Sequence, residues 1–362
     1  MSVERGTRQN AMNKENTVEF KRMAAFGASV TQQKNGYADR LAAKLGKKVK
    51  KFGYGGMHLP NAGMCFLDTV AKYRPDCVLV DWLSTGFMER SQKTLRCIDT
   101  ILYKFSATHC AVVFLILPSR RTDGRQAEKD AFHDFCREAL RVRGAHVIDI
   151  DSQLKGSDLT AALRDSIHTT ARGAEAYSDL ILGWLAEKCP KPLPPDRFGQ
   201  NAYYKDVRWM RVGREFRSKM ELTLDGEILG MYCTIGRNSG ICAVRYGDGT
   251  VREEKLWDRW CHYERKQFCL PIEQYVGPVE IQVLQDSFET SSCASSAPVD
   301  FSKYRKTVVC HAICWRGNAL ELKNRKSGKR LGALLITAMR LLRGATHIAA
   351  ARKKGKPGAA RA

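Results

Sequence analysis

The sequence predicts an α/β domain built on a doubly wound parallel sheet, followed by a second, mostly antiparallel β-domain. Over roughly the first 190 residues, short apolar runs alternate with stretches of helical periodicity, and five such pairs occur. Beyond a proline-rich stretch the pattern changes to strand-like runs separated by Asp-Gly and Gly-Pro turns. A chain of 362 residues is also long enough to favour two cores over one.

The expected strands and helices of the α/β domain alternate along the chain. The strands are RMAAFGA (22–28), KKVKKFGY (47–54), DCVLVDWL (76–83), CAVVFLIL (110–117) and AHVIDI (145–150). The helices are expected at Tyr37–Leu45, Asn61–Tyr73, Arg90–Phe105, Gln126–Val142 and Ala171–Lys188. Because such sheets bind ligands beyond the carboxyl ends of their strands, we expect the functional side chains there.

Composition gives the domain boundaries. A polar N-terminal extension (1–21) precedes the α/β domain (22–188), and CPKPLPPDRF, with four prolines in ten residues, indicates a linker over 189–199. Residues 200–318 are expected to form a β-sandwich. A basic tail with an amphipathic helix follows over 319–362.

The formal net charge of +22 is concentrated in that tail. From Glu321 to Ala362 there are twelve lysines and arginines against one acid, about half of the excess. The rest of the chain is only moderately basic and carries no recognised nucleic-acid motif, so nucleic-acid binding is not expected. The tail could rest on an anionic membrane surface, or its helix could pack on the body and leave a disordered basic end.

The cysteines and the N-terminal residues suggest a reducing compartment. The thirteen cysteines are dispersed and odd in number, and the first twenty residues lack the apolar core of a signal peptide. We therefore expect free thiols and a cytoplasmic location, with the tail allowing peripheral contact with the inner membrane face. A zinc site is not expected, because the cysteine–histidine cluster has non-standard spacings; its members are Cys261, His262, Cys269, Cys310, His311 and Cys314.

Ser29 lies directly after the first expected strand, in FGASV. A serine hydroxyl becomes a nucleophile when a base takes its proton, and that base needs an orienting partner. The stretch RDSIHTTARG supplies Asp165 and His168, spaced so that the carboxylate can hold Nδ1–H while Nε2 faces the serine. Each pattern alone arises often by chance, so the prediction depends on their combination.

In this order and fold pattern, these blocks resemble the SGNH (GDSL-like) hydrolase superfamily over residues 22–188. The resemblance implies a flavodoxin-like sheet, with Ser29 as nucleophile, His168 as base and Asp165 as its partner. No metal or other cofactor is needed. In FGYGGMH it implies an oxyanion-binding glycine, Gly56, with Gly55 as the alternative.

The third block of the resemblance departs from the family pattern. Where the family usually has G-x-N-D, whose Asn donates to the oxyanion, PDCVLVDWLSTGF places Thr85 and Gly86 at the last two positions. Ala28 also replaces the usual Asp of the first block. Losing one oxyanion donor typically costs about 10²–10³ in turnover. Either Thr85, Ser84 or a main-chain N–H substitutes, or the site is slow or inactive; the expected oxyanion hole is Ser29, Gly56 and Thr85.

The resemblance implies an ester hydrolase or O-acyltransferase that works through an acyl-enzyme, and the same side chains serve both reactions. Appended β-domains in this superfamily often accompany saccharide substrates, so an acylated carbohydrate or polysaccharide is expected. The alternatives are a lipid-directed esterase or thioesterase, and a glycan- or membrane-binding protein with a degenerate hydrolase core.

Further residues are candidate substrate contacts. His58 follows the glycine block, and Arg120 and Arg121 follow the fourth strand, where they could bind a carboxylate or phosphate. The alternatives, an incidental loop histidine and solvated loop arginines, are the more common situations for such residues. The aromatic residues that could stack on sugar rings, or instead fill the β-domain core, are Trp257, Trp260, Tyr263 and Trp315.

Overall fold

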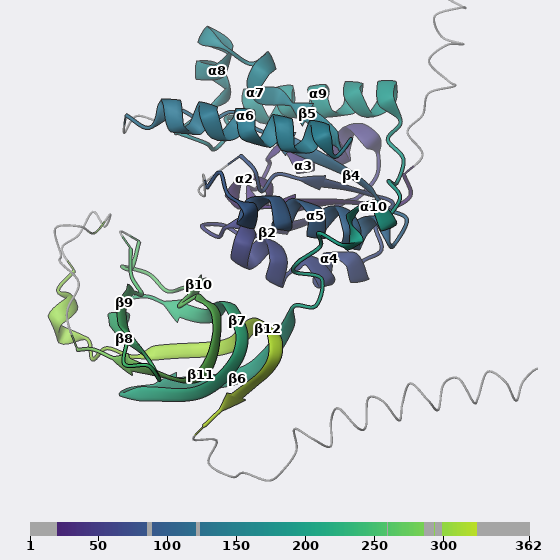
Figure 1. Ribbon diagram of the computed structural model, residues 1–362. Coiled ribbons are helices and arrows are strands. Elements are labelled where there is room, and N and C mark those ends of the chain that lie inside the picture. The colour runs from purple at the N-terminus through teal and green to yellow at the C-terminus, as the bar shows by residue number, and fades with distance from the viewer. Residues whose placement is uncertain are drawn as a thin grey trace, which may run out of the picture.

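The computed structural model describes residues 20–84, 89–120, 124–258, 260–285, 293 and 299–323. They form an α/β unit and a β-domain that lie against each other (Figure 1). Most of the expected N-terminal extension, and the basic tail beyond Lys323, lie outside the described residues. None of the helices in the described part of the chain combines the length and apolar character needed to cross a bilayer.

The α/β unit is built on a five-stranded sheet in the order β2-β1-β3-β4-β5, in which every pairing is parallel. The strands are β1 (Met23–Gly27), β2 (Val49–Gly53), β3 (Cys77–Val80), β4 (Ala111–Ile116) and β5 (His146–Asp149). This confirms the predicted doubly wound sheet. Its strand order changes direction between β1 and β3, and ligands of such sheets bind at that point.

Helices cover both faces of this sheet (Figure 1). They are α3 (Tyr37–Leu45), α4 (Leu67–Lys72), α5 (Gln92–Ser106), α6 (Gln126–Val142) and α9 (Ala171–Lys188). Successive residues of β1 point to opposite faces, so Ala24 and Phe26 pack with α5 and α6 whereas Met23 and Ala25 pack with α3 and α9. Burial on both sides explains why these strands are continuous apolar runs.

Short helical segments interrupt the connections. The helix expected over 61–73 is split into η1 (Leu59–Gly63) and α4, where the sequence contains Pro60 and Gly63. The other short helices are α2 (Ser29–Gln32), α7 (Ile150–Gln153), α8 (Gly156–Ala162) and α10 (Asp196–Gly199), with the 3-10 turn η3 (Phe301–Lys303) in the β-domain.

The β-domain is antiparallel throughout, as predicted. Its strands are β6 (Arg208–Phe216), β7 (Lys219–Ile235), β8 (Ile241–Tyr246), β9 (Val251–Lys255), β10 (Arg265–Cys269), β11 (Ile272–Val283) and β12 (Val308–Leu322). They form one seven-stranded sheet that curves over its own core, in place of two separate sandwich sheets (Figure 1). The 17-residue β7 pairs with β11 along its first part and with β10 along its second. Register shifts in its pairing with β12 allow the bend.

The proline-rich segment expected as a linker is packed against the α/β unit. It contains α10, which contacts α5 and buries Phe198. A little further on, the Tyr204 N–H donates to Thr100 Oγ1 at 3.1 Å. The chain therefore enters the β-domain from a fixed point on α5.

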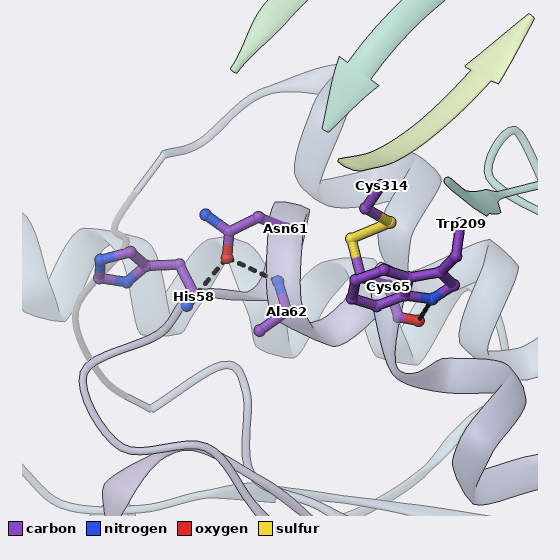
Figure 2. The surroundings of a disulfide bond; sticks show 6 residues. All are labelled: His58, Asn61, Ala62, Cys65, Trp209 and Cys314. Carbon is purple, nitrogen blue, oxygen red and sulfur yellow. Dashed lines mark hydrogen bonds between the residues drawn. A yellow bond between two sulfur atoms is a disulfide. The ribbon is translucent and has the colours of Figure 1, made fainter. Parts of the chain in front are cut away.

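A disulfide joins the two units. Cys65, just after η1, is bonded to Cys314 on β12, with a Cα–Cα distance of 6.0 Å (Figure 2). The expectation of thirteen free thiols is therefore wrong for this pair, although the other eleven cysteines are free. The expectation rested on spacing along the chain, and these partners are 249 positions apart.

Candidate active site

Ser29 is the first residue of α2, directly after β1 and therefore at the point where the strand order changes direction. The turn that presents it is tight. A Cβ placed on Gly27 would overlap the carboxylate of Asp81, so only glycine fits that position. The strand end thus places the Ser29 hydroxyl at the carboxyl edge of the sheet.

His168 and Asp165 come from the loop before α9 and meet Ser29 at this edge. His168 Nε2 lies 3.0 Å from Ser29 Oγ, and His168 Nδ1 lies 2.8 Å from Asp165 Oδ2. The other oxygen, Asp165 Oδ1, accepts hydrogen bonds from the N–H groups of Ile167 at 2.9 Å and His168 at 2.8 Å. These contacts are the ones that general-base activation of a serine requires.

Hydrogen bonds within the loop keep the carboxyl group of Asp165 ionised. Partial burial by itself raises the pKa of Asp165, but the hydrogen bonds from the His168 and Ile167 backbone and from the His168 ring outweigh it. The net result is a pKa below the ordinary value. Asp165 is therefore an ionised acceptor at neutral pH, which holds the imidazole in one orientation.

Two adjacent glutamines of the nucleophile segment hold the loops around Ser29, and sequence reasoning missed both. Gln32 Oε1 accepts the Gly55 N–H at 2.8 Å. Gln33 Nε2 donates to the Thr169 carbonyl at 2.9 Å, and its Oε1 accepts the Thr169 N–H at 3.2 Å. Gln32 is the last residue of α2, and Gln33 follows it with a non-helical ψ of 128°, so the two amides reach different loops. Two consecutive glutamines directly after Ser29-Val-Thr were the only mark of this role in the sequence near Ser29.

The glycine segment after β2 contains Gly55 and Gly56, the two residues predicted as oxyanion donors. The Gly55 N–H is taken by Gln32, whereas among the described residues no acceptor engages the N–H of Gly56 or of Ser29. A Cβ on Gly55 would lie 3.7 Å from Ser29 Cβ, so this segment runs beside Ser29. Gly56 has φ +71°, which favours glycine. The geometry therefore favours Gly56 over Gly55 as donor.

Asp81, directly after β3, is a second residue that sequence reasoning missed. It is buried, and its Oδ1 accepts the Ala28 N–H at 2.9 Å while Oδ2 accepts the Thr31 hydroxyl at 2.6 Å. Burial raises the pKa of Asp81 to about 6, against the opposing effect of these hydrogen bonds. Asp81 thus holds the turn between β1 and α2. In that turn Ala28 occupies the position where the family pattern has an acid. The signal for Asp81 was an acid inside the apolar run VLVDWL.

The remaining predicted side chains have varied positions. Thr85 and Arg121 lie outside the described residues. Ser84 Oγ donates to the Leu115 carbonyl at 3.1 Å and accepts the Leu117 N–H at 2.8 Å. Its hydroxyl proton is therefore already used in a hydrogen bond to the β4 segment, in place of an oxyanion. Arg120 donates from its backbone N–H to the Ser166 carbonyl at 2.8 Å and from Nη2 to the Asp165 carbonyl at 3.4 Å. It therefore supports the Asp165 loop.

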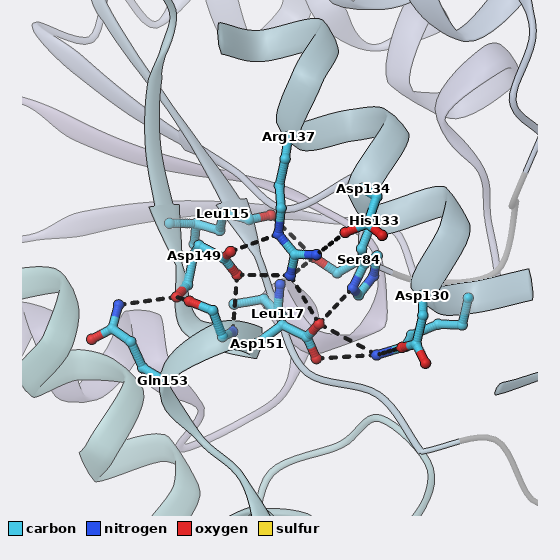
Figure 3. A network of polar contacts seen from close by, with 12 residues as sticks. Ser84, Leu115, Leu117, Asp130, His133, Asp134, Arg137, Asp149, Asp151 and Gln153 are labelled. Atoms are coloured by element: carbon cyan, nitrogen blue, oxygen red, sulfur yellow. Dashed lines mark hydrogen bonds and ion pairs between the residues drawn. The ribbon is translucent and has the colours of Figure 1, made fainter. Parts of the chain in front are cut away.

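A second histidine–aspartate pair lies within a charged network near the ends of β4 and β5 (Figure 3). His133 Nδ1 is 2.9 Å from Asp151 Oδ2, and Arg137 Nε donates to Asp149 at 2.7 Å. Burial opposes ionisation of Asp151, but His133 and Lys129 outweigh it and lower the Asp151 pKa to about 2. Within the described residues no partner meets His133 Nε2. The network therefore ties α6 to β5 and α7, and it has no nucleophile.

Three cavities follow one another along the boundary between the two units. The first, about 190 Å³, is lined by Gly56, His58, Gln267 and Trp257 among others. The second, about 110 Å³, shares His58 and Asn61 with the first and contains Lys93, Glu227 and Glu273. The third, about 320 Å³, shares these last three residues. A row of cavities therefore starts beside the expected oxyanion glycine.

The candidate aromatic residues divide between this boundary and the core. Trp257 lines the first cavity, with Lys255 Nζ 5.2 Å from its ring centre. Trp260 and Tyr263 follow in the next turn and are 45% and 48% exposed. Trp315 is buried in the β-domain core. Trp257 is therefore in a cavity wall, Trp260 and Tyr263 are at the surface, and Trp315 is in the core.

No group of three or more histidine, cysteine or acidic side chains in the described ranges is arranged to hold a metal ion. This includes the described cysteine–histidine cluster, in which Cys314 is part of the disulfide. His58 is half-buried, and burial lowers the pKa of its ring. It borders both of the first two cavities, so it remains placed for contact with a ligand.

No protein-family model and no curated protein sequence matches this chain. Among solved structures, a two-domain esterase (CEX) active on acetylated mannans matches with a TM-score of 0.59 and 12% identity, over 86% of this chain and 95% of that chain. The same esterase co-crystallised with mannopentaose gives a TM-score of 0.58, with the same identity and coverage. A member of the lipolytic protein G-D-S-L family from Veillonella parvula DSM 2008 matches at 0.38, with 13% identity, over 45% of this chain and 96% of that chain.

The first two matches span both units, so the chain shares the fold of a two-domain protein composed of an α/β domain and an appended β-domain. The predicted fold, a parallel α/β sheet followed by a separate antiparallel β-domain, is therefore confirmed.

Proposed function

We propose that this protein is a serine esterase that removes O-acyl groups from a polysaccharide. The observation that carries the proposal is the contact series from Ser29 Oγ to His168 Nε2, at 3.0 Å, and from His168 Nδ1 to Asp165 Oδ2, at 2.8 Å. A hydroxyl, a base and an ionised orienting group in this arrangement typically catalyse acyl transfer.

The reaction proceeds in two halves. Ser29 Oγ attacks the ester carbonyl carbon while His168 Nε2 takes the serine proton, and the N–H groups of Ser29 and Gly56 bind the oxyanion. The tetrahedral intermediate collapses, the C–O bond to the sugar breaks, and His168 gives its proton to the departing hydroxyl. Water then attacks the acyl-serine, again losing a proton to His168, and the carboxylic acid leaves as Ser29 recovers its proton. Asp165 stabilises the imidazolium in both halves.

The polysaccharide preference rests on the row of cavities beside Gly56. Their walls contain both donors and acceptors, among them His58, Asn61, Lys93 and Glu227, which suits a ligand rich in hydroxyl groups. Both units contribute to the walls, so a chain-like substrate can lie along the boundary. The esterase that shares this two-domain fold acts on acetylated mannans, which makes acetyl the first acyl group to test.

The alternatives differ in what they would require. A lipase needs an apolar channel for the acyl chain, whereas Glu254, Lys255 and Asp258 border the cavity next to Gly56. An O-acyltransferase would use the same residues and pass the acyl group to a sugar hydroxyl instead of water. A binding protein with a degenerate core would not need the intact contacts between Ser29, His168 and Asp165.

The decisive experiment combines covalent labelling with ester hydrolysis. We expect a fluorophosphonate to label the wild type, and Ser29→Ala and His168→Ala to abolish labelling and the hydrolysis of 4-nitrophenyl acetate. Ser157→Ala, an exposed serine on α8, serves as the matched control and should behave as wild type. A wild type that is never labelled and cleaves no activated ester would favour the binding protein instead.

Product analysis separates the two enzyme classes. With acetylated mannan, release of free acetate indicates hydrolysis, whereas transfer of acetyl to an added oligosaccharide indicates an acyltransferase. A preference for 4-nitrophenyl laurate over the acetate would argue for the lipase.

A further inference from the structure

Gln267 of the β-domain reaches across the domain boundary to the glycine segment of the α/β unit. It lies on β10, is 8% exposed, and its Nε2 donates to the Gly55 carbonyl at 3.4 Å. A Cβ placed on Gly56 would lie 2.7 Å from the same Nε2, so the amide packs directly against Gly56. The β-domain therefore touches the two residues that border the expected oxyanion hole.

The contact acts on one particular peptide group. The Gly55 carbonyl and the Gly56 N–H belong to the same peptide, and in a planar trans peptide these two groups point in opposite directions. Fixing the carbonyl therefore also fixes the direction of the N–H. A peptide between two glycines has unusual freedom to rotate, because neither residue has a Cβ to restrict it.

The same glycine is held from the other side as well. The Gly55 N–H donates to Gln32 Oε1 at 2.8 Å, so α2 holds one side of Gly55 while β10 holds the other. Of the N–H groups of these two glycines, that of Gly56 has no partner among the described residues. The two glutamines thus leave this donor directed away from Gln267 and available to an oxyanion.

The rest of the segment is anchored to the β-domain at its far end (Figure 2). Asn61 Oδ1 accepts the N–H groups of His58 at 3.2 Å and Ala62 at 2.6 Å, which stiffens the start of η1. Trp209 Nε1 donates to the Cys65 carbonyl at 2.9 Å, and the disulfide joins Cys65 to the same domain. The segment from Gly55 to Cys65 is therefore bound to the β-domain at both ends.

We propose that Gln267 is a positioning residue for ester hydrolysis: the β-domain, through this side chain, orients the Gly55–Gly56 peptide so that the Gly56 N–H binds the oxyanion. The proposal rests on the proposed function. It has particular weight here because the sequence lacks the usual asparagine donor at position 85, so oxyanion binding depends more on main-chain N–H groups.

The kinetic test uses 4-nitrophenyl acetate, which is too small to need the carbohydrate cavities. Gln267→Met keeps the size of the side chain and removes the donor. We expect kcat to fall about 10- to 100-fold with KM within about twofold of wild type, because the loss is one of transition-state orientation. The control is Gln285→Met, a β-domain glutamine whose Nε2 makes an equally long bond, 3.4 Å, to the Lys306 carbonyl away from the glycine segment.

Hydrogen–deuterium exchange of residues 53–58 in the same variants gives a measure that does not depend on activity. Faster exchange in Gln267→Met than in wild type and Gln285→Met supports the proposal, and unchanged exchange overturns it. Wild-type kcat in Gln267→Met, while Ser29→Ala remains inactive, overturns the proposal and leaves the esterase function intact. If the wild type shows no Ser29-dependent activity, the esterase function fails, and with it the proposed catalytic role of Gln267.

Discussion

Cys65 and Cys314, 249 positions apart in the sequence, form a disulfide across the boundary between the two units. Both cysteines are buried, and Cys65 lies at the end of the segment that begins at Gly55. A crosslink between distant positions restricts the unfolded chain strongly, so this bond stabilises the folded protein.

The first prediction concerns this bond. Replacing both cysteines, as Cys65→Ala with Cys314→Ala, should lower the free energy of unfolding by about 2–5 kcal/mol in urea denaturation. Cys189→Ala, which removes an exposed free thiol, is the control and should leave it unchanged. Thiol titration of the denatured, unreduced wild type should find eleven thiols. Thirteen would show that the disulfide does not form.

The second prediction concerns Gln33, whose side chain makes two hydrogen bonds to the backbone of Thr169, next to His168. Gln33→Ala should lower kcat for 4-nitrophenyl acetate about tenfold or more, because the histidine loop loses its link to the nucleophile helix. Gln153→Ala, on the exposed helix α7, is the matched control. A Gln33→Ala enzyme with unchanged kcat would mean that the remaining contacts of the loop are sufficient.

The third prediction concerns the pH dependence of stability through Asp81. Its folded-state pKa of about 6 lies above the ordinary value of 3.8. The folded state therefore binds more protons than the unfolded state between these values, and the Asp81 contribution to stability grows as the pH falls from about 6 to about 4. Asp81→Asn cannot titrate and removes this contribution.

The test is denaturant unfolding of the wild type and Asp81→Asn at pH 4, 5, 6 and 7.5. The stability of the variant relative to wild type should be most favourable above pH 6 and should decline towards pH 4. A difference that is constant over this range would show that Asp81 does not titrate with a raised pKa in the folded protein.

Much of the α/β unit could be predicted because its information is local. The helices at Tyr37–Leu45, Gln126–Val142 and Ala171–Lys188 have the expected bounds, since each has a continuous amphipathic period with turn residues at its ends. The proximity of Ser29 to His168 follows from topology, because the carboxyl ends of parallel strands meet at one edge.

The missed features depend on contacts between distant parts of the chain. Gln267 and Gly55 are 212 positions apart, and nothing in the sequence near either residue marks the other. Asp81 could be read as an ordinary residue at the end of a strand, since its role depends on the turn at Ala28, 53 positions earlier. The single curved sheet of the β-domain likewise depends on register shifts between β7 and β12, which alternation along one strand cannot show.

The last prediction concerns Asp165. Its pKa is lowered in the folded protein, so it contributes stability above its unfolded-state pKa that is lost as the pH falls through the folded-state value. Asp165→Asn should therefore be less stable than wild type at pH 7. It should also lower kcat for 4-nitrophenyl acetate about 10³- to 10⁴-fold, because a neutral amide holds the imidazole in the wrong tautomer and cannot stabilise the imidazolium. If kcat falls less than about tenfold at pH 7, then Asp165 is not the group that orients His168.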